Sequence, residues 1–404
     1  MSALLLLEDA QAQLLALAPP VREEWVATAD ALGRMLARDL TAARTQPPSD
    51  LSAMDGYALA GAGPWQVRGE ARAGASFTGV LAAGEAVRIA TGAVLPRGAD
   101  RVLIQEEATC LDDRLITSAD PAPGLHVRQR GFDFTEGQKL LETGTALSPA
   151  GLALALSAGH RAVCVARQPR VAVLESGDEL APDPENLAPG QIPASNGPML
   201  AAMLAPLVGK PLRIGPVPDD ANALADALDE AGEVDILITS GGASVGERDL
   251  IRPALEAWGA NIAFWKVAIR PGKPLLVATR EACGRRQVIL GLPGNPVSSF
   301  VTAHLFALPL CRAAMGDPAA FPVAQLMEAQ EALPAIGSRR TFARGIAEGG
   351  AEGGAEGGKV RLAGSQDSSA LAALAAANCL IEREPNAPEV PPGGKVVVQM
   401  IRNG

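Results

Sequence analysis

Residues 239–249, T-S-G-G-A-S-V-G-E-R-D, follow a strand-like run at 234–238 and have a composition suited to binding an anion. Glycines let backbone N–H groups approach a ligand closely, and a helix after the loop would direct its positive end to the same place. The glycines and serines concerned are Ser240, Gly241, Gly242, Ser244 and Gly246. A tight turn that binds nothing explains them equally well, because one glycine-rich loop is a weak motif.

Three further loops in the same part of the chain follow predicted strands. They are E-S-G-D-E-L at 175–180, I-R-P-G-K-P at 269–274 and G-L-P-G-N-P at 291–296. The carboxyl ends of parallel strands share one edge of a sheet, and ligands bind just beyond that edge. We therefore expect the loops after parallel strands to line one pocket, while a loop beside an antiparallel strand needs the structure to place it.

Basic residues gather around these loops although the formal net charge of the 404-residue chain is −10. A phosphate or another oxyanion needs such a local cluster. The residues are Arg248, Arg252, Lys266, Arg270 and Lys273. The acidic balance and the low aromatic content of 3% argue against a nucleic-acid partner, which would need a basic surface or stacking platforms.

Four acids in this region offer hard oxygen ligands for Mg²⁺, which takes one or two carboxylates together with ligand phosphates. They are Glu179, Asp219, Asp220 and Asp249. A structural alternative stays open, because Asp219 or Asp220 precedes a predicted helix at 221–231 and Asp249 precedes one at 250–258, where each would cap the helix.

The remaining reactive residues exclude several kinds of site. The three histidines are far apart, which argues against a histidine-rich metal centre, and no Ser-His-Asp or Cys-His arrangement favours covalent catalysis. The five cysteines form no C-x-x-C pair, which favours a reducing compartment such as the cytoplasm. Leucines 4–7 lack preceding basic residues, so we expect a helix there and no signal peptide, and no apolar run long enough to span a membrane.

The elements that must position these residues divide the chain by pattern. Alternating strands and helices from residue 170 to about 315 predict an open α/β sheet with mostly parallel strands. Short strands separated by glycine turns at 65–147 predict a β-rich domain, and those after Pro318 a small barrel or sandwich. Helical spacing at 3–17 and 22–38 predicts two helices, and the A-E-G-G repeats at 347–358 a flexible hairpin tip.

Six motifs in order along the chain resemble those of the molybdopterin molybdenumtransferases, the family of bacterial MoeA and the gephyrin E domain. They are S-A-M-D-G-Y-A at 52–58, T-G-A at 91–93, S-G-D-E-L at 176–180, S-G-G-A-S-V-G at 240–246, P-G-K-P at 271–274 and G-L-P-G-N-P at 291–296. Each motif is weak alone, but their order is specific, and the resemblance covers nearly the whole chain.

The resemblance implies four domains. An elongated N-terminal domain would comprise residues 1–41 and 138–167, a β-rich insertion 42–137, an α/β molybdopterin-binding domain 168–317 and a C-terminal β-barrel 318–404. It also implies a homodimer whose cleft takes residues from both subunits, and other molybdenum cofactor synthesis proteins as partners. The implied reaction inserts molybdate into the dithiolene of adenylylated molybdopterin with Mg²⁺ and releases AMP.

Residue roles follow from the resemblance by position. The residues expected to carry the reaction are Asp249, Lys266, Lys273, Asp55 and Thr91, with Glu179 and Asp249 as metal ligands. The residues expected to bind the substrate are Ser240, Gly241, Gly242, Ser244, Gly246, Arg270, Pro293, Gly294, Asn295, Asp219, Arg344 and Ser368. Asp133 matches a family acid without an assigned role. Arg270 stands where the family commonly has Lys, which replaces a point ammonium by a planar guanidinium.

Two other functions fit parts of the pattern. A molybdopterin adenylyltransferase would share the α/β domain, but the motif at 52–58 and the long β insertion argue against it. A non-catalytic scaffold would share the whole fold, and the presence of Asp249, Lys266 and Lys273 argues against that function.

Overall fold

The computed structural model describes residues 4–241, 250–282, 284–349 and 358–401. Packing divides the chain into two compact units. The first unit contains residues 1–23 and 166–404, and the second contains residues 24–165.

A six-stranded sheet organises the first unit, with the order β16-β13-β17-β21-β20-β18. Its strands are β13 (Val171–Ser176), β16 (Leu212–Val217), β17 (Ile236–Ser240), β18 (Asn261–Lys266), β20 (Pro274–Ala282) and β21 (Arg285–Leu292). Neighbours from β16 to β21 pair in parallel, and β20 pairs antiparallel with both β21 and β18. The predicted open, mostly parallel α/β sheet is confirmed.

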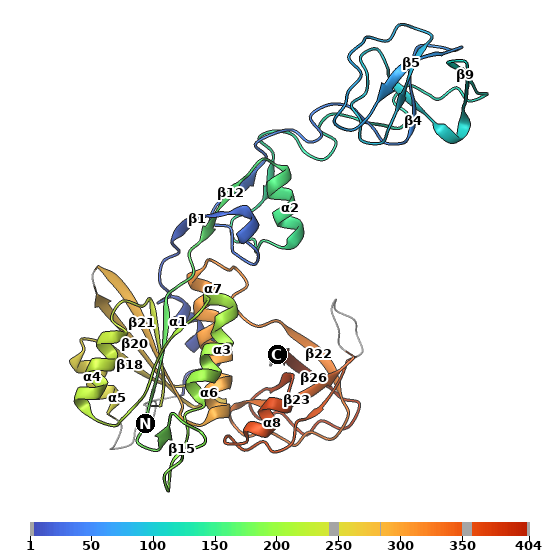
Figure 1. Ribbon diagram of the computed structural model, residues 1–404. Coiled ribbons are helices and arrows are strands. Elements are labelled where there is room, and N and C mark those ends of the chain that lie inside the picture. The colour runs from blue at the N-terminus through green and yellow to red at the C-terminus, as the bar shows by residue number, and fades with distance from the viewer. Residues whose placement is uncertain (1–3, 242–249, 283, 350–357, 402–404) are drawn as a thin grey trace. The chain divides into compact units, whose positions relative to one another are not determined.

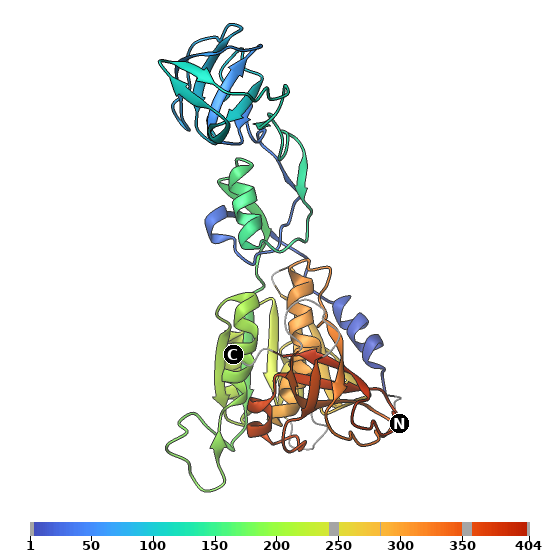
Figure 2. The same ribbon diagram turned by 90° about the vertical axis from the view of Figure 1, so that its right-hand side faces the viewer.

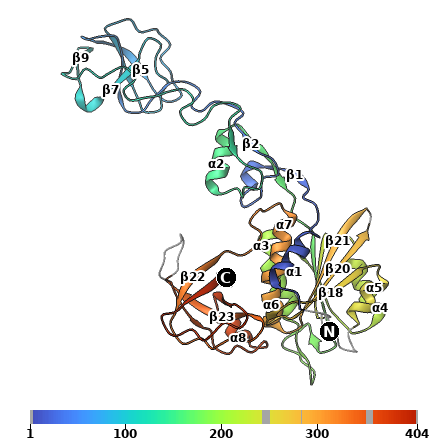
Figure 3. The same ribbon diagram turned by 180° about the vertical axis from the view of Figure 1, so that it is seen from behind.

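Helices cover both faces of this sheet (Figure 1). One face packs against α1 (Leu7–Leu15), α3 (Asn196–Val208), α6 (Pro296–Thr302) and α7 (Leu308–Ala314), and the other against α4 (Ala221–Glu230) and α5 (Ile251–Ala257). Side chains alternate across a strand, so Val171 and Val173 of β13 join the first core whereas Ala172 and Leu174 join the second. The view from behind shows α1 beside α7 (Figure 3).

One helical run in this unit is long and apolar enough to cross a membrane, by length and composition alone. The expectation that no apolar run is long enough is therefore wrong. The run comprises residues 296–314, where the π-helix η3 (Ala303–Ala307) joins α6 to α7. Buried residues make up 89% of an 18-residue apolar stretch of this run. Its apolar character therefore fits a core helix.

The C-terminal part of the first unit closes into a five-stranded barrel. Its strands are β22 (Ala324–Ala329), β23 (Arg340–Glu348), β24 (Lys359–Leu362), β25 (Cys379–Arg383) and β26 (Lys395–Met400), and α8 (Leu371–Ala376) lies between β24 and β25. The ring closes because β23 pairs with both β24 and β25. The short strand β19 (Ile269–Arg270) pairs with β23, which joins the barrel to the loop that carries Arg270.

A chain of polar side chains also joins the barrel to the helices. His304 Nε2 lies 3.2 Å from Gln399 Oε1, and Gln399 Nε2 donates to Glu382 at 2.8 Å. Arg340 then pairs with Glu382 at 3.2 Å and with Glu8 of α1 at 2.6 Å. Burial lowers the pKa of His304 to about 4, so His304 is neutral at physiological pH and donates to Gln399.

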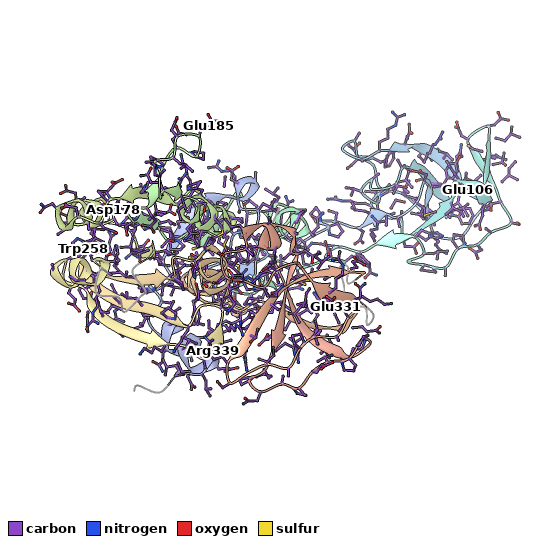
Figure 4. The ribbon with its side chains drawn as sticks, turned by 90° about the horizontal axis from the view of Figure 1, so that it is seen from below. Glu106, Asp178, Glu185, Trp258, Glu331 and Arg339 are labelled. Atoms are coloured by element: carbon purple, nitrogen blue, oxygen red, sulfur yellow. The ribbon has the colours of Figure 1, made fainter. Side chains whose placement is uncertain are left out.

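Two short strands, β14 (Leu180–Ala181) and β15 (Ile192–Pro193), pair in parallel after β13. The loop between them projects from the unit, with Glu185 at its tip (Figure 4).

The second unit contains a six-stranded sheet of order β7-β4-β6-β5-β9-β8 (Figure 2). Its strands are β4 (Gly56–Ala60), β5 (Gln66–Ala71), β6 (Glu85–Ile89), β7 (Arg101–Ile104), β8 (Thr109–Leu111) and β9 (Arg114–Ile116), with η2 (Gln105–Glu107) after β7. Three strand pairs accompany it: β1 (Glu23–Ala27) with β12 (Ala162–Ala166), β2 (Leu40–Thr41) with β11 (Lys139–Leu141), and β3 (Leu51–Ser52) with β10 (Val127–Arg128). Ser148 caps the helix α2 (Pro149–Ser157), because its hydroxyl accepts from Gly151 N–H.

The helix expected at 22–38 is wrong. The segment forms strand β1, the short 3₁₀ helix η1 (Thr28–Asp30) and irregular chain. Burial alternates along β1, and its β-strand partner β12 comes from 135 residues or more away in sequence, so long-range pairing overrides the local helical spacing. The helix expected at 3–17 is confirmed as the shorter α1.

A substitution of Leu290 tests the packing of the core in the first unit. Its side chain is fully buried in β21, so Leu290→Ala should lower the free energy of unfolding by about 2–5 kcal/mol through lost burial and a residual cavity. Urea unfolding followed by circular dichroism measures the change. The control Leu187→Ala, at an exposed position, should change it little; an equal loss in both variants would contradict the assigned packing.

Candidate functional site

The sheet edge at the carboxyl ends of the parallel strands borders a cavity of about 810 Å³. Its walls come from the ends of β13, β17 and β21 and from the beginnings of α3 and β20. Those lining residues include Glu175, Ser176, Glu179, Asn196, Ser240, Gly241, Pro274, Pro293, Gly294 and Asn295. The three loops that follow parallel strands therefore border this cavity, as expected, and Pro274, which ends the fourth loop, also lines it.

The antiparallel strand β20 does not remove its loop from this edge. Because β20 runs opposite to its neighbours, its beginning lies at the edge where they end. Pro274 opens β20 opposite Lys266, the last residue of β18. The loop with Arg270 and Lys273 thus reaches the same edge as the glycine-rich loop.

Only the first part of the glycine-rich loop is described. Ser240 is buried at the end of β17, and Gly241 has φ +98° while its N–H donates to Leu292 O at 3.1 Å. That backbone conformation favours glycine. The remaining predicted loop residues, Gly242, Ser244, Gly246 and Asp249, lie outside the described residues.

A buried carboxylate, Glu175, holds the beginning of α3 in the cavity wall. Its two oxygens accept the backbone N–H groups of Asn196 and Gly197, each at 3.0 Å. A Cβ on Gly197 would lie 2.6 Å from Glu175 Oε2, so only glycine permits this approach. Burial raises the pKa of Glu175, although the hydrogen bonds from Gly197 and Asn196 lower it in part.

Asn196 follows that cap and bridges two loops of the cavity. Its Nδ2 donates to Ser240 Oγ at 3.0 Å and to Gly294 O at 2.7 Å. Neither Asn196 nor the capping role of Glu175 was predicted from the sequence. A polar residue between a strand-end loop and an apolar helix, as in S-N-G-P-M-L, was the pattern that could have indicated it.

The acids expected to bind Mg²⁺ have different environments. Glu179 lines the cavity, which fits one carboxylate ligand, and its carboxyl group lies over Gly177. Asp219 is exposed, and its N–H donates to Asp178 at 3.0 Å. Asp220 caps α4 by accepting from Asn222 and Ala223 N–H, which confirms the capping alternative for that residue. The described residues contain no cluster of three or more possible metal ligands.

A second cavity of about 440 Å³ lies between the loop after β18 and the barrel, and four arginines are among its lining residues. They are Arg270, Arg339, Arg344 and Arg383. Its other polar lining residues are Ser298, Gln366, Asp367, Ser368 and Thr341. Arg339, marked in Figure 4, comes from the loop before β23. This cavity can attract an anion more strongly than the first, because the first has no lysine or arginine among its described lining residues.

Arg344 is 1% exposed and supports the turn that carries Ser368. One of its terminal nitrogens donates to Ser365 O at 2.6 Å and to Asp367 O at 3.0 Å. Burial lowers its pKa from the usual arginine value. Asn295 Nδ2 donates to Ser368 Oγ at 3.2 Å, so a residue of the first cavity contacts one of the second. The two cavities are therefore neighbours.

The predicted lysines have no carboxylate partner among the described residues. Lys266 contributes its backbone O to Leu5 N–H at 2.8 Å, and Lys273 contributes its own to Val267 N–H at 2.9 Å. Both hydrogen bonds fix the backbone and use no side-chain atom. Arg270 and Lys273 are exposed, so their charges remain available to a ligand.

Asp55 and Thr91 lie together in the second unit. Asp55 Oδ1 accepts the backbone N–H of Thr91 at 2.7 Å, which joins the turn before β4 to the turn after β6. Asp133 is exposed in the same unit, beside the largely exposed Phe132.

Replacing Glu175 by glutamine should change the pH dependence of stability. A carboxyl whose pKa is raised on folding stabilises the fold below its unfolded pKa, near 4.5, and that contribution is lost as pH rises through the folded pKa. The stability of the wild type minus that of Glu175→Gln should thus fall as pH rises across this window. Urea unfolding between pH 4 and 8 measures this difference, and a difference that does not change with pH would contradict the assignment.

Comparisons with known proteins agree along the whole chain. Residues 5–159 match the MoeA N-terminal region (domain I and II), residues 172–313 a probable molybdopterin binding domain, and residues 327–401 the MoeA C-terminal region (domain IV). The molybdopterin molybdenumtransferase of Haemophilus influenzae is 34% identical over 98% of both chains. That of Nostoc sp. is 36% identical over 78% of this chain and 74% of its own.

Solved structures agree with the sequence relatives. A crystal structure of the molybdopterin biosynthesis MoeA protein from Pyrococcus horikoshii matches 99% of this chain and all of its own with a TM-score of 0.81 and 28% identity. A second structure of that protein gives a TM-score of 0.83 with 25% identity over the same shares. With the matches to all three MoeA regions, the chain belongs to the molybdopterin molybdenumtransferase family.

Proposed function

We propose that this chain is a molybdenum cofactor synthesis enzyme that inserts molybdate into the dithiolene of adenylylated molybdopterin and releases AMP. The observation that carries the proposal is the pair of neighbouring cavities, one lined by acids, amides and serines at the sheet edge and the other by four arginines. The substrate has the matching parts, because it joins neutral heteroaromatic rings to phosphates and reacts with an oxyanion. Membership of the transferase family supports the same reaction.

The basic side chains would act by electrostatic stabilisation. Lys266, Lys273 and Arg270 would hold the phosphoanhydride and molybdate and stabilise negative charge as the anhydride breaks. No described carboxylate neutralises the charges of these side chains. The side chains therefore need not break an ion pair within the protein before they bind the substrate. Arg344 would act mainly by positioning Ser368, because its described hydrogen bonds go to the supporting turn.

The glycine-rich loop and its neighbours would hold the rest of the substrate. Ser240 and Gly241, with Gly242, Ser244 and Gly246 of the remaining loop, would cradle the substrate phosphates. Pro293, Gly294 and Asn295 would form the opposite wall, and Asp219 would lie at the rim. Bound Mg²⁺ would neutralise phosphate charge, and we propose Glu179 and Asp249 as its protein ligands, since one or two carboxylates suffice for this ion beside phosphate oxygens.

We also propose that the protein acts as a cytoplasmic homodimer whose cleft takes Asp55 and Thr91 from the second unit of one subunit. The hydrogen bond between these two residues supports a common role. We propose that the chain has four domains, at 1–41 with 138–167, 42–137, 168–317 and 318–404. Other molybdenum cofactor synthesis proteins would supply the substrate and receive the product.

The reaction itself is tested with purified protein, adenylylated molybdopterin, molybdate and Mg²⁺. AMP should appear only when molybdate is present, and chromatography of nucleotides measures it. Release without molybdate dependence, under conditions where a relative is active, would contradict the proposal. Consumption of ATP with molybdopterin alone would favour an adenylyltransferase.

The shared cleft predicts complementation between two inactive variants. Lys273→Ala should lower turnover about 10²–10³-fold by removing one preorganised cation, and Asp55→Ala should also inactivate the enzyme. When the two variants are mixed, dissociated and allowed to reassociate, half of the dimers should contain one subunit of each variant, and each such dimer has one intact cleft of two. The mixture should therefore recover about a quarter of wild-type activity. Lys210→Ala, at an exposed position away from both cavities, serves as the control for Lys273→Ala. No recovery in proven mixed dimers would place both residues in one subunit's cleft.

A further inference from the structure

The orientation of the Asn196 amide is fixed by its contacts. Gly294 O can only accept a hydrogen bond, so the amide atom that lies 2.7 Å from it must be Nδ2. Nδ2 uses its second hydrogen on Ser240 Oγ. The other amide atom, Oδ1, is buried and has no hydrogen-bond donor.

This unpaired acceptor belongs to a rigidly held residue. Asn196 is 7% exposed, and its backbone N–H is fixed by Glu175 at 3.0 Å. The amide is therefore held at the backbone and at Nδ2, while Oδ1 is left over. A buried acceptor without a donor is unfavourable, so a donor that reaches it recovers free energy.

The surroundings of Oδ1 select the chemistry of that donor. Asn196 lines the 810 Å³ cavity together with the carboxyl groups of Glu175 and Glu179 and with the hydroxyl groups of Ser176, Ser195, Ser240 and Ser369. Oδ1 itself can only accept a hydrogen bond, so it does not pair with an oxygen of phosphate or molybdate, which also only accepts. It favours a neutral ring that carries an amino group.

We infer that Asn196 Oδ1 accepts a hydrogen bond from the ring amino group of the bound substrate and so fixes one of its heteroaromatic rings in this cavity. The inference rests on the proposed function, because adenylylated molybdopterin carries such a group on both its pterin and its adenine. Oδ1 is covered in this structure, so the amino group reaches it after a neighbouring side chain moves.

Pairs of probes that differ only in the amino group test the inference on the full-length protein. AMP is compared with purine riboside 5′-monophosphate, and pterin with pteridin-4-one, by calorimetry on the wild type and on Asn196→Ala. The wild type should prefer the amino-bearing probe of one pair about tenfold, and Asn196→Ala should lose that preference. Asn196→Ala also loses the hydrogen bonds from Nδ2, but that loss affects both probes of a pair alike. It therefore cancels when the two probes are compared on the same variant.

Asn378→Ala is the matched control. Both amide atoms of Asn378 are satisfied by Ala347 in the barrel, so this variant should keep the wild-type preference. A preference lost in the AMP pair identifies the adenine as the ligand of Asn196, and one lost in the pterin pair identifies the pterin. No amino preference in the wild type, or one that survives in Asn196→Ala, overturns the inference while leaving the proposed function intact. Failure of the wild type to bind any of the four probes counts against both.

Discussion

The cap that Glu175 places on α3 is the interaction on which the candidate site depends. It joins the end of a central strand to the beginning of a buried helix through two hydrogen bonds. The backbone around it is correspondingly tight, because a Cβ at Gly215 would lie 2.2 Å from Glu175 O and one at Gly197 would lie 2.6 Å from its carboxylate. Asn196 follows from this clamp, and through Asn196 the loops after β17 and β21 are held together.

The two neighbouring cavities divide the electrostatics of the site. Arginines concentrate around the cavity beside the barrel, whereas the lining of the cavity at the sheet edge includes acids and amides and no described arginine or lysine. The chain as a whole has a net charge of −10, so attraction for an anion arises from local placement and not from overall charge. A ligand with both a charged and a neutral part can be oriented by this contrast before any specific contact forms.

Much of this arrangement was predictable from the sequence, and the rest depended on long-range contacts. Strand and helix alternation after residue 170 predicted the α/β sheet because each element there has its own periodicity. The antiparallel β20 could not be foreseen, since direction is set by pairing, yet it is what brings Arg270 and Lys273 to the edge. Strand β1 was mistaken for a helix because its partner is distant in sequence. Asn196 was missed because an unpaired amide oxygen is visible only after its other contacts are known.

The packing between the helices and the barrel bears on how this chain could be divided or recombined. Val297 and Phe300 of α6 share one continuous core with Phe342 and Leu380 of the barrel. The neutral His304 is also linked to Gln399 and, through the chain of polar side chains described above, to Arg340. A boundary near residue 318 is therefore a division of the sequence but not of the packing. A barrel grafted from a relative onto this α/β domain would need the matching helix surface of that relative. We therefore expect the two parts to change together during evolution.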